Sequence, residues 1–333
     1  MNSPAPPLPT VDEARALRAA GEWQALVQRV APFAREELLR EPELAYLYAV
    51  ACRRVGQTAE ALALGGELEP EARRRGDRRL LGDAINLVGV ALWESGRAGD
   101  AEERFGELLD LASTSGNEES TANACNNLGV LANVRGRRDL ALTFYQRALA
   151  AYRRVGNAEG LARTHQNLGI SYRDLGFDGE ADRHFTRVIE LGDELGADEL
   201  VAMAEIERAS LRVRRGDAPL GAEMARRAEV RFQRIGSAAG AADARRVIAA
   251  AEREQGRLEH SLEILDESLA VAVSHDDLVL RAEVQRDRGL LLRDRGDIAA
   301  ARDALADAVS SFARIGAEAE AEALRAIIAE LAP

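Results

Sequence analysis

The chain contains 333 residues and carries a formal net charge of −12, from 44 basic and 56 acidic side chains. This acidic balance argues against broad nucleic-acid binding, which requires a basic surface. Every basic residue is an arginine, a bias that a GC-rich bacterial genome would produce. Because the sequence has no lysine, a lysine Schiff base and a P-loop lysine are both excluded.

The first ten residues, MNSPAPPLPT at 1–10, are rich in proline and are expected to be disordered. No basic and apolar signal segment leads the chain. The least polar stretch, AINLVGVALW at residues 84–93, is too short to span a bilayer. We therefore expect a cytoplasmic protein with no membrane insertion.

From residue 56 onward, glycines recur every forty residues, and a second series of glycines lies midway between them. The first series comprises Gly56, Gly96, Gly136, Gly176, Gly216, Gly256 and Gly296. The second comprises Gly76, Gly116, Gly156, Gly196, Gly236 and Gly316, with Asp276 at the one remaining position. A period this regular over most of the chain predicts a repeat solenoid rather than a compact enzyme domain.

Residues 117–156 illustrate the repeat unit, which reads as two amphipathic helices because apolar and small residues return at helical spacing in each half. A glycine closes each half, as expected for the left-handed residue that ends a helix. The residue after the glycine is expected to cap the next helix where it is Asn117, Asn157, Asp217 or Asp297. Pro219, the proline that fits this pattern least well, falls in a first helical turn, where proline is tolerated.

Two columns of the aligned repeats hold only small residues, which lets neighbouring helices cross closely. One column lies seven residues before each turn glycine and includes Gly89, Gly129 and Gly169. The other lies five residues after it and includes Ala141 and Ala181. Bulky residues follow nine positions after the glycine in three units, namely Phe105, Tyr145 and Phe185.

These features resemble the tetratricopeptide repeat family, whose helix pairs carry small residues at these places, an aromatic residue in the second helix and a glycine between the helices. The family norm is about thirty-four residues per repeat, and the longer period here is similar to that of the LGN-type adaptors. The resemblance implies an all-α, right-handed superhelical solenoid of helix-turn-helix units, with about eight repeats and a C-terminal capping helix. The expected boundaries are residues 11–38, 39–76, 77–116, 117–156, 157–196, 197–236, 237–276 and 277–316 for the repeats, and residues 317–333 for the capping helix.

The sequence offers no constellation for catalysis, a cofactor or a metal ion. Cys52 and Cys125 both fall in predicted helices and are interpreted as free buried thiols. None of the four histidines belongs to a two-histidine metal motif, and no CxxC motif occurs. His165 lies in a packing column and is interpreted as a core side chain rather than a catalytic base. We therefore expect a protein that is not an enzyme.

The resemblance implies that the first helix of each repeat lines a concave surface on which a ligand lies. By column, the lining positions fall thirteen, ten, six and three residues before the turn glycine, which is a helical stripe. The column six residues before is mostly apolar and includes Val130 and Ile170. The columns ten and three residues before together hold six arginines and no acid. These arginines either extend along the helix surface or bind acidic side chains or a free carboxylate of a ligand.

Primary amides gather on the same stripe in the third, fourth and fifth repeats. A primary amide both donates and accepts hydrogen bonds, so it can hold the backbone of an extended ligand, or it can instead fix one repeat against the next. Trp93 is a further candidate, as an aromatic anchor. The full set of candidate binding residues is Asn86, Trp93, Asn123, Asn126, Asn127, Val130, Asn133, Arg163, Gln166, Asn167, Ile170, Arg173, Arg246, Arg286 and Arg293.

The sequence favours a non-enzymatic adaptor or scaffold that binds an extended or helical segment of a partner protein in its concave groove. The expected partner is a protein or peptide, with acidic residues or a free C-terminus, and not a nucleic acid. Two alternatives remain open at this point. The first alternative is a receptor for a signalling peptide or a regulatory sensor. The second is a structural subunit of a larger assembly.

Overall fold

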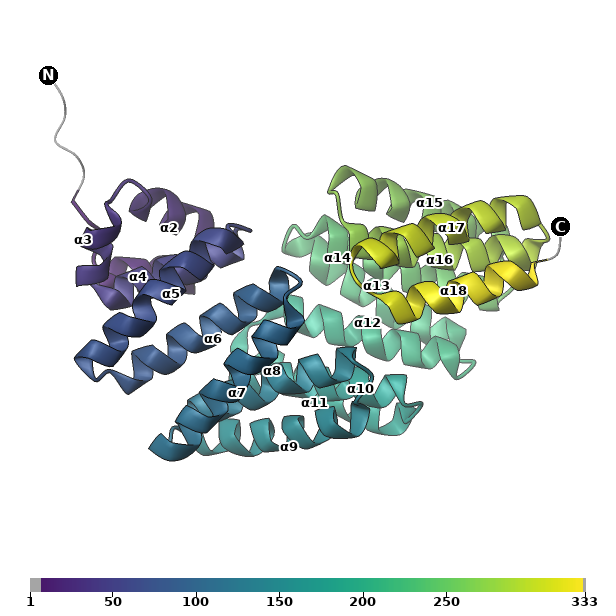
Figure 1. Cartoon of the computed structure of the whole chain (residues 1–333). Coiled ribbons are helices and arrows are strands. Elements are labelled where there is room, and N and C mark those ends of the chain that lie inside the picture. Colours follow the sequence, from purple (N-terminus) through teal and green to yellow (C-terminus); the bar gives the residue numbers. More distant parts are fainter. Residues whose placement is uncertain (1–6, 332–333) are drawn as a thin grey trace, which may run out of the picture. The chain divides into compact units, whose positions relative to one another are not determined.

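The computed structural model describes residues 7–331, which lie in helices and the short turns between them, with no strand in that range (Figure 1). Residues 1–6 of the proline-rich tail lie outside the described residues, as do 332–333. The described part contains eighteen helices, α1 to α18. This all-helical architecture confirms the fold class expected from the periodicity.

The chain divides into two units, one up to Thr164 and one from His165 onward. The helices of the first unit are α1 (Val11–Ala19), α2 (Trp23–Val30), α3 (Arg35–Arg40), α4 (Pro42–Arg54), α5 (Thr58–Arg75), α6 (Arg78–Glu94), α7 (Ala98–Ser115), α8 (Glu118–Val134) and α9 (Arg138–Val155). Helix α10 (Ala158–Asp174) spans the division between the units. The second unit continues with α11 (Asp178–Leu195), α12 (Asp198–Arg214), α13 (Ala218–Arg234), α14 (Ala238–Glu254), α15 (Leu258–Ser274), α16 (Leu278–Arg295), α17 (Ile298–Arg314) and α18 (Glu318–Glu330).

Within each unit, consecutive helices pack side by side in pairs, as α8 with α9 and α16 with α17 do (Figure 1). The last helix, α18, covers the end of the second unit. Its Ala321 and Leu324 are buried in one cluster with Leu305 and Phe312 of α17. A solenoid needs such a terminal cover because its last repeat would otherwise expose an apolar face.

The close helix crossings depend on the small residues that recur in the sequence. A Cβ atom added to Gly129 would lie 2.5 Å from the Tyr145 ring, and Gly89 has the same relation to Phe105. Tyr145 and Phe105 are themselves buried. Each bulky residue of a second helix therefore packs directly on the glycine of the preceding first helix, sixteen positions earlier in the chain.

The turn glycines adopt the left-handed conformation that the sequence predicts. Asp276, which takes the place of a glycine in the series, adopts it too, with φ of 51°, and it is the one non-glycine residue with positive φ in the described chain. The repeat geometry therefore imposes this backbone conformation even where the residue type disfavours it.

The N-cap residues fall into two groups that differ in backbone geometry and in whether the side chain caps the helix. Between repeats, ψ of the capping residue lies between 90° and 97° at Asp77, Asn117, Ser237 and Asp277, and each side chain accepts a backbone N–H. Asn157 caps in the same way. Within a repeat, ψ is 59° at Asp217 and 66° at Asp297, and neither side chain caps its helix. The prediction of caps at these two aspartates is therefore wrong.

Proline placement follows the sequence prediction at one site and departs from it at another. Pro219 lies in the first turn of α13. Pro70 lies in the interior of α5, which continues through it to Arg75. Proline removes a backbone donor from the helix at this point. The helical periodicity continues on both sides of Pro70, so the sequence gives no sign of an interruption.

Candidate functional site

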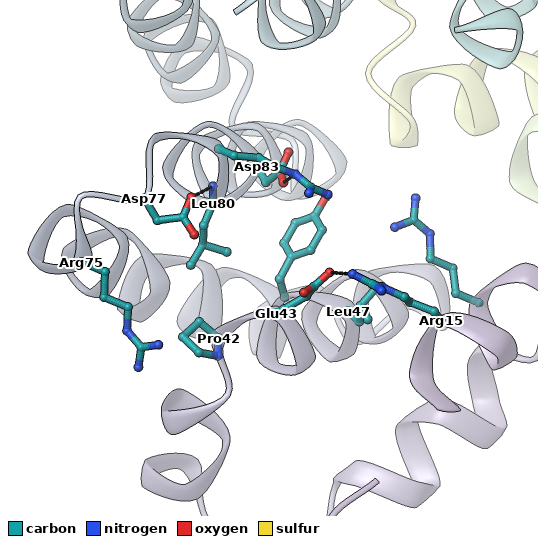
Figure 2. Close-up of a pocket in the computed structure, with 11 residues that line it drawn as sticks. Arg15, Pro42, Glu43, Leu47, Arg75, Asp77, Leu80 and Asp83 are labelled. Atoms are coloured by element: carbon teal, nitrogen blue, oxygen red, sulfur yellow. Dashed lines mark hydrogen bonds and ion pairs between the residues drawn. The ribbon is translucent and has the colours of Figure 1, made fainter. Parts of the chain in front are cut away.

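A groove of about 750 Å³ in the first unit lies along the first helices of successive repeats. Its walls come from α1, α4, α6, α8 and the start of α10, with Trp23 of α2 and Tyr152 of α9 also in contact. A smaller pocket of about 290 Å³ adjoins it and shares Arg15, Tyr46 and Asp83 (Figure 2). The groove is therefore built by the face that the resemblance assigned to ligand binding.

The charge of this groove is opposite to that of the whole protein. Six arginines face three carboxylates, a local balance of 6 − 3 = +3, while the chain carries −12. The arginines are Arg15, Arg18, Arg53, Arg54, Arg79 and Arg163, and the carboxylates are Asp83, Glu119 and Glu159. Such a local surplus attracts an anionic group in spite of the net charge.

Two of these arginines have no carboxylate partner among the described residues. Arg18 is exposed on α1. Arg54 instead places its Cζ over the Trp23 ring, 5.6 Å from the ring centroid. Burial lowers the pKa of Arg54, and the neighbouring Arg53 and Arg163 lower it further. Glu159 and Glu94 oppose this lowering without cancelling it, so an added anion would stabilise the Arg54 cation.

The other arginines of the groove have acidic neighbours. Arg15 pairs with Glu43, as Figure 2 shows, and Arg53 pairs with Glu94. Arg163 pairs with Glu159 four residues earlier on the same helix, and both side chains are more than half exposed. Exposed pairs of this kind are worth about 0–1 kcal/mol, so a ligand carboxylate can replace them at little cost.

Asp83 is half-buried, whereas the other two carboxylates of this groove are exposed, and Figure 2 shows Asp83 across the pocket from Glu43 and Arg15. Burial raises the pKa of Asp83 to about 6, although Arg79 opposes the rise. The nearest guanidinium nitrogen of Arg79 lies 3.8 Å from Asp83 Oδ2. Burial, helped by the charge of Asp83, also raises the pKa of Tyr46 to about 12. The Tyr46 hydroxyl is therefore a hydrogen-bond donor at neutral pH.

The candidate residues of the first unit divide between the groove and the helix interfaces. Asn86, Asn123 and Arg163 line the groove. Trp93 packs half-buried against the core, and Val130 is half-buried on α8. Neither of these two, nor Asn126, Asn127 or Asn133, is among the groove-lining residues.

Several of the asparagines join one repeat to the next. Asn127 Nδ2 donates to Asn86 Oδ1 at 2.9 Å, and Thr164 Oγ1 donates to Asn126 Oδ1 at 3.2 Å. Within a single repeat, Tyr152 donates its hydroxyl to Asn123 Oδ1 at 2.6 Å. Each bond engages only part of the capacity of a primary amide, which has two donors and an acceptor. The asparagine row therefore has a structural role, which the sequence left as one of two alternatives.

The candidate residues of the second unit are occupied by protein partners or buried. Gln166 is buried, Asn167 is half-buried, and Ile170 packs against a core cluster. Arg173 bonds to Asp174 and Glu207. Arg286 bonds to Asp287, and Arg293 bonds to Asp294.

Arg246 is the most heavily paired of these arginines. Asp243, Glu283 and Asp287 lie 3.0, 2.8 and 2.9 Å from its guanidinium nitrogens. Burial acts to lower the pKa of Arg246, but the three carboxylates outweigh it and hold the pKa well above its usual range. The compensating acids lie in other columns of the repeat, next to the two columns that contain arginines and no acid.

The sequence missed much of the groove of the first unit. Arg79, Glu119 and Glu159 occupy a column seventeen residues before the turn glycine, one helical turn beyond the stripe considered above. Extending the stripe by four residues would have found them. Arg18 and Trp23 belong to the irregular first repeat, where no column could be aligned.

No constellation for metal binding emerges from the side chains between residues 7 and 331. His165 is buried, and its Nδ1 lies 2.8 Å from His184 Nδ1, in a hydrogen bond that needs one of the two nitrogens protonated. Cys52 and Cys125 are buried free thiols. No helix in the described range has both the length and the apolarity to cross a membrane.

Part of the sequence matches a known protein family, and several solved structures have a similar fold. The tetratricopeptide repeat family model matches residues 120–194. No curated protein matches the chain. Among solved structures, a Rap protein complexed with competence and sporulation factor is 14% identical, with a TM-score of 0.63 and 96% of each chain covered.

Two further solved structures have similar scores. NprR in complex with its cognate peptide NprX is 12% identical, with a TM-score of 0.65, covering 86% of this chain and 81% of that one. The apo form of the quorum sensor NprR from B. thuringiensis is 14% identical, with a TM-score of 0.61, covering 96% and 94%. Residues 120–194 thus match the tetratricopeptide repeat family, and the chain has the fold of tetratricopeptide repeat solenoid proteins.

Proposed function

We propose that this protein is a non-catalytic peptide-binding module that acts as an adaptor or receptor and holds a peptide segment of its partner in the groove of the first unit. The observation that carries the proposal is the arginine surplus of that groove, in which Arg18 and Arg54 have no carboxylate partner. A groove of about 750 Å³ accommodates several side chains of an extended or helical segment.

The residue types of the groove suit a peptide ligand. Arg18 and Arg54 offer guanidinium groups, which bind carboxylates through paired N–H donors. Trp23 and Tyr46 offer aromatic surface, which dominates the energetics of many interfaces. Asn86 and Asn123 supply amide groups that can meet a peptide backbone. The ligand is therefore a peptide with acidic side chains or a free C-terminal carboxylate.

Four of the arginines that the sequence predicted to bind an anion are not part of the proposed site. Arg173, Arg246, Arg286 and Arg293 are already bound to carboxylates of the protein. A ligand carboxylate would have to displace those partners, and Arg246 alone has three of them. Arg163 stays in the proposed site because its exposed pair with Glu159 is weak.

A receptor for a signalling peptide is favoured over a passive scaffold by one comparison. The structure of NprR with its cognate peptide NprX shows that a protein of this fold accommodates a peptide. At 12% identity the likeness extends to the fold alone, so the chemistry of the ligand follows from the residues of the groove.

The test is a titration of the full chain with labelled nonapeptides followed by fluorescence anisotropy. One probe alternates glutamate with leucine, a second replaces each glutamate by glutamine, and a third carries a C-terminal amide. We expect the acidic probe to bind more tightly than the glutamine probe and to weaken as salt rises, since exposed charges are screened. Equal affinity of the acidic and glutamine probes, or binding that is independent of salt, would contradict the proposal.

A further inference from the structure

The second unit contains a groove of its own with the opposite charge. It measures about 430 Å³ and is lined by α12, α14 and α16 together with Arg173 of α10 and Phe232 of α13. Five carboxylates line it against two arginines, a local balance of 2 − 5 = −3. The carboxylates are Glu199, Glu207, Asp243, Asp277 and Glu283.

The two arginines of this groove do not offer a binding site for an anion. Arg173 is held by Glu207, and Arg246 is held by Asp243 and Glu283. Glu199, by contrast, is exposed and forms no ion pair within the described residues. Burial raises the pKa of Glu207 even though Arg173 opposes the rise. An additional cation would lower that pKa toward its ordinary range.

Apolar side chains are exposed in the same groove. Met203 on α12 is 44% exposed and Val279 on α16 is 54% exposed, while Ile206 and Phe232, which also line the groove, are buried. The long stems of lysine and arginine can lie along apolar surface while their charged groups reach a carboxylate. The groove therefore offers both the apolar surface and the carboxylates that a lysine or arginine side chain can contact.

We propose that this groove binds a basic segment of a partner polypeptide, in which a lysine or arginine lies next to an apolar residue. The charged group would meet Glu199, and the apolar residue would cover Met203 and Val279. Charge complementarity selects this occupant, since an acidic segment would be repelled by the surplus of carboxylates. This site is independent of the groove of the first unit, so either proposal can fail without the other.

The test uses a labelled nonapeptide that alternates lysine with leucine, titrated into the full chain. Because the protein is acidic overall, the decisive result is a comparison of matched variants. Glu199→Arg should weaken binding roughly fivefold or more. Glu194→Arg makes the same change of charge at an exposed residue of α11 outside the groove and should leave affinity within about twofold.

A second pair of variants tests the apolar contact. Val279→Ser should weaken binding, whereas Val230→Ser, at a valine of α13 that is 56% exposed and outside the groove, should not. The proposal is overturned if the lysine probe does not bind, or if groove and control variants lose affinity equally. It is also overturned if Val279→Ser abolishes a concentration-dependent dimer in light scattering, because the groove would then be covered by a second copy of the chain.

Discussion

Arg54 stacks on Trp23 in the groove of the first unit, with 5.6 Å between the guanidinium carbon and the ring centroid. An aromatic face partly compensates a cation, but it is a weaker partner than a carboxylate and contributes about 0.5–1 kcal/mol at an exposed site. Arg53 and Arg163 meanwhile lower the pKa of Arg54. Arg54 therefore contributes little to the stability of the fold and remains available to a ligand.

Because of this arrangement, Arg54→Gln should weaken ligand binding while changing the stability of the fold very little. The variant loses the cation–π contact but also the repulsion from two arginines, so the free energy of unfolding should change by less than about 0.5 kcal/mol. Binding of the acidic probe should weaken several-fold. Thermal melting and anisotropy on the same sample check both parts. A variant that melts early and binds normally would show that Arg54 is structural.

The contact between Gly129 and Tyr145 predicts a large effect of side-chain size. Gly129→Leu should destabilise by about 3 kcal/mol or more, since a Cβ atom alone would approach the buried ring to 2.5 Å. The matched control is Gly106→Ala on α7, where a Cβ atom meets no atom within 4 Å. That change should stabilise by about 0.5–1 kcal/mol through helix propensity. If chemical denaturation gave both variants the same sign, the packing column would be misassigned.

The left-handed backbone at Asp276 predicts a stabilising substitution. With φ of 51° at this residue, Asp276→Gly should raise the free energy of unfolding by about 1 kcal/mol, the cost of this conformation for a residue with a Cβ atom. The converse change, Gly236→Ala at φ of 73°, should destabilise by a similar amount. Urea denaturation measures both, and a loss of stability in Asp276→Gly would indicate that the aspartate side chain stabilises its turn.

The buried carboxyl of Asp83 predicts a pH dependence of stability. Its folded pKa of about 6 lies above the ordinary value of 3.8, so the folded state binds the proton more tightly than the unfolded state. The stabilisation is therefore fully present below about pH 4 and is lost as pH rises through about 6, a change of roughly 1–3 kcal/mol. In Asp83→Asn this component should vanish from a plot of stability against pH, and a superimposable plot would contradict the assignment.

The repeat architecture could be predicted from the sequence because each residue of the pattern contacts only its own or an adjacent helix. Gly129 and Tyr145 recur at fixed spacing, and their contact follows from two adjacent helices. The caps at Asn117 and Asn157 follow from the same regularity. Asp217 was misassigned because a cap depends on ψ of the turn, which residue type alone does not reveal.

The binding residues were harder to predict, because charge compensation crosses columns and repeats. Arg246 stands in a column without acids, yet Asp243, three residues earlier, and Asp287, one repeat later, both bind it. Trp23 lies in the irregular first repeat, where the periodic alignment gave no guide. The predicted arginines of the second unit are therefore paired with carboxylates, and the arginine surplus lies in the groove of the first unit.

The most direct test of the peptide-binding account is calorimetric titration of the acidic nonapeptide into the wild-type chain and into the double variant Arg18→Glu with Arg54→Glu. The matched control is Arg138→Glu, an exposed arginine of α9 outside the groove. The account predicts that the double variant loses at least about tenfold in affinity, as expected when charge complementarity becomes repulsion, while the control binds like the wild type. Equal affinity of the wild type and the double variant would contradict it.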